Sequence, residues 1–551
     1  MPIQATSPHT GFFSLNPSPA QARFDEELAH IRVLAAKREF AKAREALLSL
    51  ADSSPAREHP YCFIGLAEEL NDLGYLSDAE SVCNTAMDCA KGKDIEEIAV
   101  KKTALYLLGA IAAEAACHDV TKHIDRKLLQ IFPKDQHILF YLLYHASYDP
   151  LTNPKKHKAL AKCWAKQVCQ KTQNRPPALP LNGRPLRVGY VSGDFKVHPV
   201  GFFLRGIFPC HDTARVTVFA YNTGKDDQNP VLQFLTPYCT LRHVAKLDDA
   251  AFEAQIRKDA IDVLVDLSGF TSGNRLTVFA RQPAAVMISW LGYWATTGLD
   301  CLDAVLLDPW HAPEGTDNEY VEPIFRLPVT RFCYQPISEE PQVSPTPPCL
   351  KNGYLTYGCF NNTTKYNSQL LDVWAAILHK QETAHLLLKW KTFHDPAMQQ
   401  RILQAFERRG IAADRLAFRG WSAHQTMLSE YADVDIALDT FPFSGGITTC
   451  NALWMGVPVV TLKGQSVVGR QGYAFLKQLD LEELCARNAD HYTNIASQLG
   501  HELTLLKALR TSLRERMRRS PLLDVRGFTR HLEDAFDSIY TARVAKDAQK
   551  A

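Results

Sequence analysis

The sequence predicts an α + α/β protein, in which a helical repeat domain is followed by two α/β domains. Three observations support this fold class. Apolar residues recur at three- and four-residue steps over residues 22–170, the spacing of an amphipathic helix. After Pro185, short apolar runs alternate with amphipathic segments, as in a parallel sheet with crossover helices. The same alternation begins again after a proline-rich stretch at 336–350.

The helical region has the pattern of degenerate hairpins. Its first two helix pairs break at Lys37–Glu39 and at Gly74-Tyr75, roughly one tetratricopeptide-type period apart, and a third pair spans Ile98–Phe132. We therefore expect a tetratricopeptide-like α-solenoid over residues 22–170, an architecture that serves as an interaction scaffold. A plain helical bundle is the alternative. Residues 1–21 are expected to form a disordered lead-in.

The two α/β domains are expected at 186–335 and at 351–546, preceded by linkers at 171–185 and 336–350. The strands expected in the first domain are Leu186–Val191, Thr217–Tyr221, Val263–Leu267, Val286–Leu291 and Ala304–Leu307. Those expected in the second are Leu355–Phe360, Leu386–Lys389, Leu416–Arg419, Ile436–Asp439 and Val459–Leu462. Two Rossmann-like domains with terminal helices that cross back suggest the GT-B arrangement of glycosyltransferases. In that arrangement a ligand binds in the cleft between the domains.

Composition excludes several classes of protein. With 61 basic and 60 acidic residues the net charge is +1, so charge gives no case for a nucleic-acid partner. No apolar run approaches the ~20 residues of a membrane helix, and the N-terminus lacks the layout of a signal peptide. The 14 cysteines form no CxxC pair. Together these features predict a cytoplasmic protein without membrane insertion.

The stretch Phe441–Leu462 (FPFSGGITTCNALWMGVPVVTL) has the layout of an anion site. A buried strand ends at Asp439, a glycine turn follows, and a helix then begins. The amides and hydroxyls of such a turn and helix start suit a diphosphate. An ordinary βαβ crossover with a glycine turn is the alternative. Ser444, Gly445 and Gly446 form the expected turn, and the helix is expected to begin at Thr448 and Thr449 and to run through Trp454.

Other polar side chains also follow predicted strands. His198 lies in VSGDFKVHPVGFF, and Lys365 lies beside Asn362 in GCFNNTTKYN, where a cation and amides could meet a phosphate. His424 lies one helix upstream of the glycine turn, in WSAHQ. Singly, each has a structural or surface role as its alternative, but three strand-end sites together favour a common ligand.

No metal constellation is expected. Asp433-Val434-Asp435 is formally a DxD sequence, which metal-dependent glycosyltransferases use to hold a cation. Asp433 ends a helix and Asp435 opens a buried strand, so a structural role is favoured.

These stretches, with DLSGFTSGNRL and SWLGYWATTGLDCLDAVLLD, resemble the protein O-linked N-acetylglucosamine transferase family, which includes the SPINDLY-type plant enzymes and bacterial relatives. The resemblance covers about Leu186–Tyr540. It implies tetratricopeptide repeats followed by an inverting, metal-independent GT-B core. Family members use a nucleotide sugar, commonly UDP-GlcNAc, and glycosylate Ser or Thr hydroxyls of proteins.

The resemblance also implies roles for particular residues. His198 would lie beside the sugar and the acceptor, as a base or a positioning group, and Lys365 would neutralise the donor diphosphate with Asn362 beside it. The rest of the implied nucleotide-sugar site is Tyr293, His424, Gly445, Gly446, Ile447, Thr448 and Thr449, which include the phosphate cradle, and Asn451, at the ribose position.

Several positions depart from the family pattern. Phe270 replaces a histidine that is common in bacterial relatives, and Trp294 puts a bulky indole near the sugar site. Asn451 is neutral where an acidic residue is usual, although an amide can still bond to ribose hydroxyls. These departures leave the donor open between UDP-GlcNAc, UDP-glucose, GDP-fucose and others.

The sequence thus predicts a protein glycosyltransferase that moves a sugar, first of all GlcNAc from UDP-GlcNAc, to Ser or Thr. The helical domain would bind the protein or peptide acceptor. An O-fucosyltransferase or an N-glucosyltransferase of the same fold is one alternative. A helical-repeat scaffold that binds a nucleotide sugar without transferring it is the other.

Overall fold

The structure is a computed structural model, and it describes residues 19–53, 59–90, 92, 94–133, 135–151, 153–169, 175–224, 229–336 and 341–549. Residues 1–18 of the predicted lead-in lie outside the described residues, and helix α1 already begins at Pro19. Residues 171–174 and 337–340 of the two predicted linkers also lie outside them. The chain divides into two compact units, residues 1–141 with 352–427 and residues 142–351 with 428–551.

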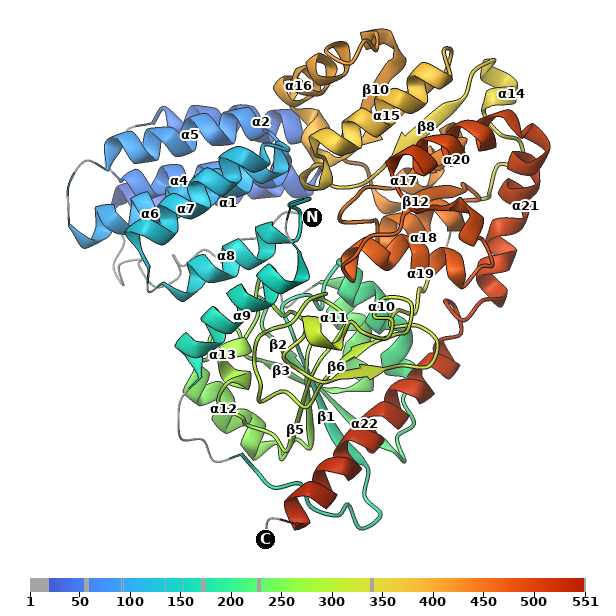
Figure 1. The fold of residues 1–551 in the computed structure, drawn as a ribbon. Helices are drawn as coiled ribbons and strands as arrows, with labels where there is room; N and C mark the ends of the chain where they lie inside the picture. The colour runs from blue at the N-terminus through green and yellow to red at the C-terminus, as the bar shows by residue number, and fades with distance from the viewer. Residues whose placement is uncertain are drawn as a thin grey trace. The chain divides into compact units, whose positions relative to one another are not determined.

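The first unit begins with three helical hairpins that pack side by side (Figure 1). Each hairpin turns through one residue with a left-handed backbone: Arg38 at φ 67°, Gly74 at φ 90° and Ala116 at φ 60°. In every case the amide of the next residue donates to the carbonyl five residues back, as in a Schellman motif. The prediction of three degenerate hairpins is confirmed. The helices are α1 (Pro19–Ala36), α2 (Phe40–Ala51), α4 (Pro60–Leu73), α5 (Leu76–Cys89), α6 (Ile95–Glu114) and α7 (His118–Ile131).

The same unit contains three parallel strands, with β9 between β8 and β10. These are β8 (Thr356–Cys359), β9 (His385–Lys389) and β10 (Leu416–Arg419). Two crossover helices start where a side chain caps the first turn. The Asn367 side chain accepts a hydrogen bond from the Leu370 amide before α15 (Ser368–Lys380), and the Asp395 side chain accepts one from the Ala397 amide before α16 (Pro396–Glu407). Helix α17 (His424–Glu430) follows β10.

The second unit contains a seven-stranded parallel sheet in the order β3-β2-β1-β4-β5-β6-β7. The five predicted strands are all present, as β1 (Leu186–Ser192), β2 (Val216–Asn222), β4 (Val263–Asp266), β5 (Val286–Ser289) and β6 (Ala304–Leu307). The prediction missed β3 (Thr240–His243) and β7 (Ile324–Arg326), the two edge strands. Neither edge strand has a fully buried side chain, so neither has the apolar run of a central strand. The strand order reverses between β1 and β4, where doubly wound sheets bind ligands.

The remaining strands of this unit are β11 (Ile436–Leu438), β12 (Val459–Leu462) and β13 (Cys485–Ala486), and β13 was not predicted. Within this unit β12 pairs in parallel with both β11 and β13. The other helices are α8 (Gln136–Ala146), α9 (Pro154–Val168), α10 (Pro199–Ile207), α11 (Pro230–Leu235), α12 (Asp249–Lys258), α13 (Leu276–Phe279), α14 (Cys349–Asn352), α18 (Ile447–Trp454), α19 (Gln471–Lys477), α20 (Ala489–His501), α21 (Leu503–Arg519) and α22 (Val525–Ala548).

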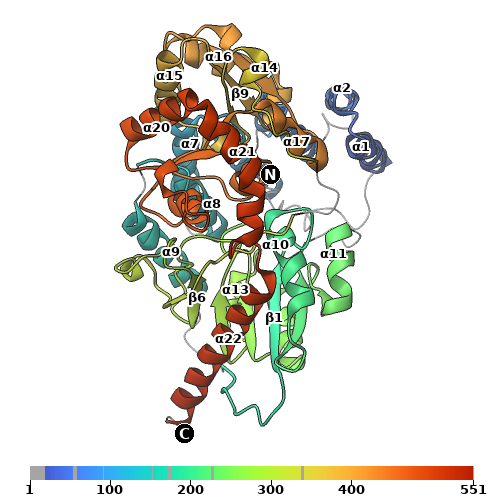
Figure 2. The same ribbon diagram turned by 90° about the vertical axis from the view of Figure 1, so that its right-hand side faces the viewer.

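The last helix, α22, returns to the first sheet (Figure 2). Phe536 of α22 packs against Tyr190 of β1, with ring centroids 6.2 Å apart. The buried Glu533 carboxylate accepts hydrogen bonds from the His211 ring and the Asp212 amide, both at 2.9 Å. The prediction of terminal helices that cross back is therefore confirmed. Among the helices of the described residues, none combines the length and apolar character needed to cross a membrane.

Candidate functional site

The glycine turn between β11 and α18 is held by one buried carboxylate. Asp439, directly after β11, accepts hydrogen bonds from the Gly445 amide at 2.6 Å, the Thr440 amide at 2.9 Å and the Thr461 hydroxyl at 2.7 Å. Three hydrogen bonds to one buried carboxylate hold the turn firmly against the end of the strand. Residues 440–445 therefore fold back over the end of the strand, and α18 begins at Ile447, one residue before the expected start.

Gly445 is required where it stands because the turn passes so close to its anchor. A β-carbon at Gly445 would lie 2.8 Å from Thr448 Oγ1 and 3.0 Å from Asp439 Oδ1, with Thr449 Oγ1 closer still. At Gly446, by contrast, a β-carbon would meet only Gln471 Oε1, at 3.8 Å. The hydroxyls of Thr448 and Thr449, in the first turn of α18, therefore pack directly against Gly445.

A second segment, residues 466–478, supports the turn from the other side. The Ser444 amide donates to the Val468 carbonyl at 3.1 Å, and the Gly472 amide donates to Ser444 Oγ at 3.2 Å. Gln471 adds a longer bond from its side-chain amide to the Ser444 carbonyl, at 3.4 Å. The start of α18 is thus fixed on two sides by hydrogen bonds that involve no ligand.

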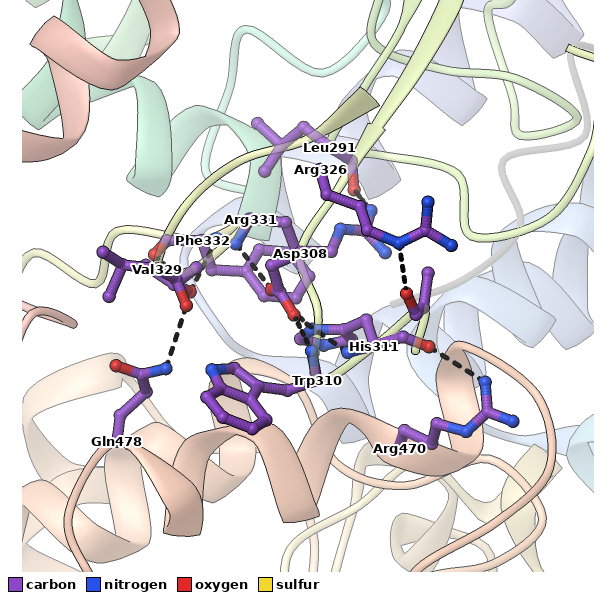
Figure 3. Close-up of polar contacts among 12 residues, drawn as sticks. Leu291, Asp308, Trp310, His311, Arg326, Val329, Arg331, Phe332, Arg470 and Gln478 are labelled. Atoms are coloured by element: carbon purple, nitrogen blue, oxygen red, sulfur yellow. Dashed lines mark hydrogen bonds and ion pairs between the residues drawn. The ribbon is translucent and has the colours of Figure 1, made fainter. Parts of the chain in front are cut away.

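Residues 466–478 are in turn bound to loops that follow β6 and β7 of the first sheet (Figure 3). Arg470 donates from Nη1 to the His311 carbonyl at 3.0 Å, and Gln478 donates to the Val329 carbonyl at 2.9 Å. His311 itself is buried, and its Nδ1 donates to Asp308 Oδ2 at 2.7 Å. Burial alone would raise the pKa of Asp308. The His311 ring and the backbone amides that donate to the carboxylate outweigh burial, so the Asp308 pKa is lowered.

The Arg331 guanidinium lies in the same cluster and is also buried (Figure 3). Its Nη2 donates to the Leu291 and Tyr293 carbonyls, at 2.9 and 3.1 Å, and burial lowers its pKa to about 10. Among the described residues, its other two nitrogens and His311 Nε2 have no hydrogen-bond partner. The cluster fixes the backbone at Leu291–Tyr293, next to the aromatic residues described below.

Aromatic side chains cover the loop that leads into the turn. Phe443 stacks on Tyr148, with centroids 4.8 Å apart, and meets the edge of Trp294 at 4.7 Å. The Trp294 indole N–H donates to Ser147 Oγ at 2.9 Å. Trp294 also lines a cavity of about 60 Å³ together with Tyr320, Pro442 and Val467. The Trp294 indole, which departs from the family pattern, is therefore packed beside the glycine turn.

Tyr293 is buried beneath these aromatics, and its hydroxyl lies 3.2 Å from His157 Nε2. Phe270 packs edge-on between Tyr293, at 5.4 Å, and Trp164 of α9, at 4.8 Å. Phe270 is thus a buried core aromatic.

His198 ends the loop after β1 and caps helix α10. Its Nδ1 accepts the Val200 amide at 3.3 Å and lies 3.6 Å from Asp194 Oδ2. The side chain is 24% exposed, and burial lowers its pKa to about 4, although the Asp194 charge acts in the opposite direction. Because Nδ1 accepts a hydrogen bond, the neutral ring carries its proton on Nε2. In this arrangement Nε2 is a hydrogen-bond donor.

Asn451 is a buried residue of α18, and its amide oxygen accepts the Tyr334 hydroxyl at 2.9 Å. Thr448 is half-buried, and its backbone carbonyl accepts the Tyr431 hydroxyl at 3.2 Å. The structure thus brings six predicted residues together at the start of α18: Gly445, Gly446, Ile447, Thr448, Thr449 and Asn451. Phe443, just before this turn, contacts Trp294, which in turn contacts Tyr293.

Lys365 belongs to the first unit, in a short 3-10 turn (Thr363–Lys365) that follows β8. Asn362 caps this turn by accepting the Thr364 amide at 2.9 Å. The half-buried Lys365 ammonium donates to Asn361 Oδ1 at 3.0 Å. His424 begins α17 after β10, and burial lowers its pKa. All three predicted residues of this unit therefore follow the carboxyl ends of parallel strands.

Prediction from the sequence missed two sets of supporting residues. Asp439 was recognised only as the end of a strand, although a carboxylate directly before a glycine turn was visible. The roles of Arg470 and His311 depend on residues 159 positions apart, so no local pattern could reveal them. Within the described part of the chain, no three His, Cys, Asp or Glu side chains gather as a metal site requires.

The sequence matches the family model described as glycosyl transferase family 41 over residues 119–336 and 348–532. It is 36% identical over 362 residues to the probable UDP-N-acetylglucosamine–peptide N-acetylglucosaminyltransferase SPINDLY of Petunia hybrida, covering 65% of this chain and 39% of that protein. The chain thus spans about two-fifths of that relative. A UDP-N-acetylglucosamine–peptide N-acetylglucosaminyltransferase of Caenorhabditis elegans is 23% identical over 557 residues, covering 77% of this chain and 47% of that protein.

Among solved structures, a mutant of Thermobaculum terrenum O-GlcNAc transferase matches with a TM-score of 0.85 and 29% identity. The match covers 96% of this chain and 100% of that chain. It confirms the predicted fold class, a helical region followed by two Rossmann-like domains of the GT-B type.

Proposed function

The chain belongs to glycosyl transferase family 41, and on that basis we propose that it transfers N-acetylglucosamine from UDP-GlcNAc to Ser or Thr hydroxyls of protein acceptors. The observation that carries the proposal is the glycine turn held by Asp439 at the start of α18. Such a helix start binds a phosphate group through its amides, its hydroxyls and its dipole. The SPINDLY and Caenorhabditis elegans relatives are named for UDP-N-acetylglucosamine as donor and peptide as acceptor.

The transfer is a single displacement with inversion. The acceptor oxygen forms a bond to the anomeric carbon while the bond from that carbon to the diphosphate oxygen breaks. The acceptor proton leaves to a base or to solvent, and the diphosphate departs with an additional negative charge. We propose, as the family resemblance implies, that Lys365 stabilises that charge without a metal, and separately that the amides of residues 447–449 donate to a phosphate group.

We assign His198 a positioning role in this reaction. A general base must present a lone pair to the acceptor hydroxyl. The lone pair of His198 at Nδ1 accepts the Val200 amide, so in the neutral ring Nε2 carries the proton and is a donor. That proton is suited to an oxygen of the sugar or the diphosphate.

We propose UDP-GlcNAc as the first choice of donor, and the departures from the family pattern define the alternatives to test. Asn451 would offer ribose an amide whose oxygen already accepts the Tyr334 hydroxyl, and the Trp294 indole packs edge-on against Phe443. Asn362 and His424 complete the proposed nucleotide-sugar site, and the helical hairpins are proposed to bind the acceptor.

Calorimetry against UDP, GDP, TDP and their common sugars tests the donor directly. We expect UDP and UDP-GlcNAc to bind and to raise the unfolding temperature, because a ligand that binds only the folded state stabilises it. Selective binding of GDP or GDP-fucose would overturn UDP-GlcNAc as donor. Binding of UDP-GlcNAc without transfer or hydrolysis would instead identify a nucleotide-sugar-binding scaffold.

A further inference from the structure

The loop that carries Lys365 is held by the turn between helices α6 and α7. The Thr363 hydroxyl donates to the Glu114 carbonyl at 2.7 Å, and His118 Nε2 lies 2.8 Å from the Tyr366 carbonyl, to which it donates. These two bonds lie on either side of Lys365, and they link residues about 250 positions away in the chain. Thr363 and Tyr366 are fully buried, so the Thr363–Glu114 bond is shielded from water, and the Tyr366 carbonyl is a buried acceptor that the half-buried His118 ring reaches.

The chemistry of helix ends explains why these bonds form. Glu114 is the last residue of α6, so its carbonyl has no partner within the helix and needs an outside donor. Thr363 supplies that donor and also contacts the Thr392 hydroxyl at 3.0 Å. His118 is the first residue of α7, where its ring reaches the Tyr366 carbonyl. If either hydrogen bond were broken, a buried carbonyl would lose its partner, which costs free energy.

The other two hairpins make equivalent contacts with the next two strand-end loops. The Lys391 ammonium, after β9, donates to the Asn71 carbonyl at 2.7 Å and lies 3.0 Å from Glu114 Oε2. The Ser77 amide donates to Asp395 Oδ2 at 2.8 Å. The Trp421 ring, after β10, packs against Phe40 with ring centroids 5.5 Å apart, and the Arg38 guanidinium lies over the same ring. Each hairpin turn thus contacts a loop at the carboxyl edge of the same three strands.

We propose that the α6–α7 turn is a positioning device for Lys365, in which Glu114 and His118 fix the 363–366 turn that presents the ammonium to the donor diphosphate. This inference rests on the proposed function of Lys365. It gives the helical region a second role: besides offering a surface to the acceptor, its third hairpin sets the geometry of the donor site.

A double-mutant cycle on UDP binding tests the proposal. Calorimetry with UDP compares the wild type, His118→Ala, Lys365→Met and the double variant. We expect His118→Ala to weaken UDP binding about fivefold, the effect of roughly one net hydrogen bond. In the Lys365→Met background it should have no further effect, because it acts through the lysine. An equal loss in both backgrounds, or no loss in either, would overturn the proposal.

Rescue variants separate positioning from general stability. His118→Gln keeps an N–H donor and should restore UDP affinity, whereas exposed His123→Ala on the same helix should not change it. Thr363→Val removes the other bond, and Thr363→Ser restores its donor, so this pair replaces His118→Ala if that variant does not fold. If Lys365→Met itself binds UDP like the wild type, the proposed role of Lys365 fails and the inference with it. If Lys365→Met weakens UDP binding and His118→Ala weakens it further by the same factor, the positioning role is contradicted while the proposed role of Lys365 stands.

Discussion

At the scale of single residues, the hydrogen bonds of His198 decide its chemistry. A histidine at the end of a strand is a natural candidate for a base, and its sequence motif allowed either a base or a positioning group. The structure adds the cap on α10 through Nδ1 and a pKa near 4 caused by burial. A group with that pKa stays neutral throughout the physiological range.

The pH dependence of transfer checks this assignment. Because His198 is already deprotonated above pH 5, we expect kcat/KM to show no inflection from it between pH 5 and 8. His198→Asn retains a side chain that can cap α10 and should lose less stability than His198→Ala, for which the lost cap costs about 1 kcal/mol. An inflection near pH 6.5 that disappears in His198→Asn would contradict the positioning role.

Residue types at the site were easier to predict than their partners. Lys365, Asn362 and the glycines were identified from motifs at strand ends. No motif could identify the hydrogen bonds between Tyr334 and Asn451 or between Tyr293 and His157, because the two residues of each pair are more than 100 positions apart in the sequence. A motif specifies which groups are present, whereas packing determines which atoms they bond.

At the scale of elements, the glycine turn depends on close contact between backbone and carboxylate. Gly445→Ala would force the added methyl group against Thr448 and Asp439. We expect the overpacking to cost about 1–3 kcal/mol and to reduce UDP affinity by at least tenfold, as the start of α18 shifts. Calorimetry with UDP, with unfolding followed by circular dichroism, measures both effects.

Gly65→Ala is the matched control, since a β-carbon there meets nothing within 4 Å and the site lies inside α4. It should leave UDP binding unchanged and can stabilise the helix by up to about 1 kcal/mol. A folded Gly445→Ala that binds UDP like the wild type would show that the turn is not the phosphate site.

The central strands and the hairpins were predictable because burial leaves a clear periodic pattern. The strands that were missed, β3, β7 and β13, are short or lie at sheet edges, where side chains need not be apolar. The hairpin turns were located by sequence at Lys37–Glu39 and Gly74-Tyr75. Only the second turn has a glycine, Gly74, in the left-handed conformation; Arg38 and Ala116 occupy that position in the first and third turns.

At the scale of the whole molecule, buried histidines make folding sensitive to acid. Burial lowers the pKa of His157 to about 4, against an ordinary value of 6.5. Between these values the unfolded chain binds a proton that the folded chain does not, so stability falls as the pH falls from 6.5 to 4. Above pH 6.5 this contribution to stability is fully present.

Urea unfolding at pH 7 and pH 5 measures this effect. We expect the wild type to lose about 2 kcal/mol more than His157→Gln over this interval, from about 1.4 kcal/mol per pH unit per proton. His123→Gln, which removes an exposed histidine, should follow the wild type. Equal pH dependence in the wild type and His157→Gln would show that His157 does not carry the effect.

The proposed sugar transfer, with Lys365 and the glycine turn as the groups that stabilise the leaving diphosphate without a metal, has one direct test. The most direct measurement is mass spectrometry of an acceptor protein incubated with UDP-GlcNAc and either the wild type or Lys365→Met, with and without EDTA. We predict that the wild type adds one N-acetylhexosamine mass per modified site regardless of EDTA. Lys365→Met should fold normally and lose at least a hundredfold in rate. Transfer by Lys365→Met at the wild-type rate, or transfer that EDTA abolishes, would contradict the account.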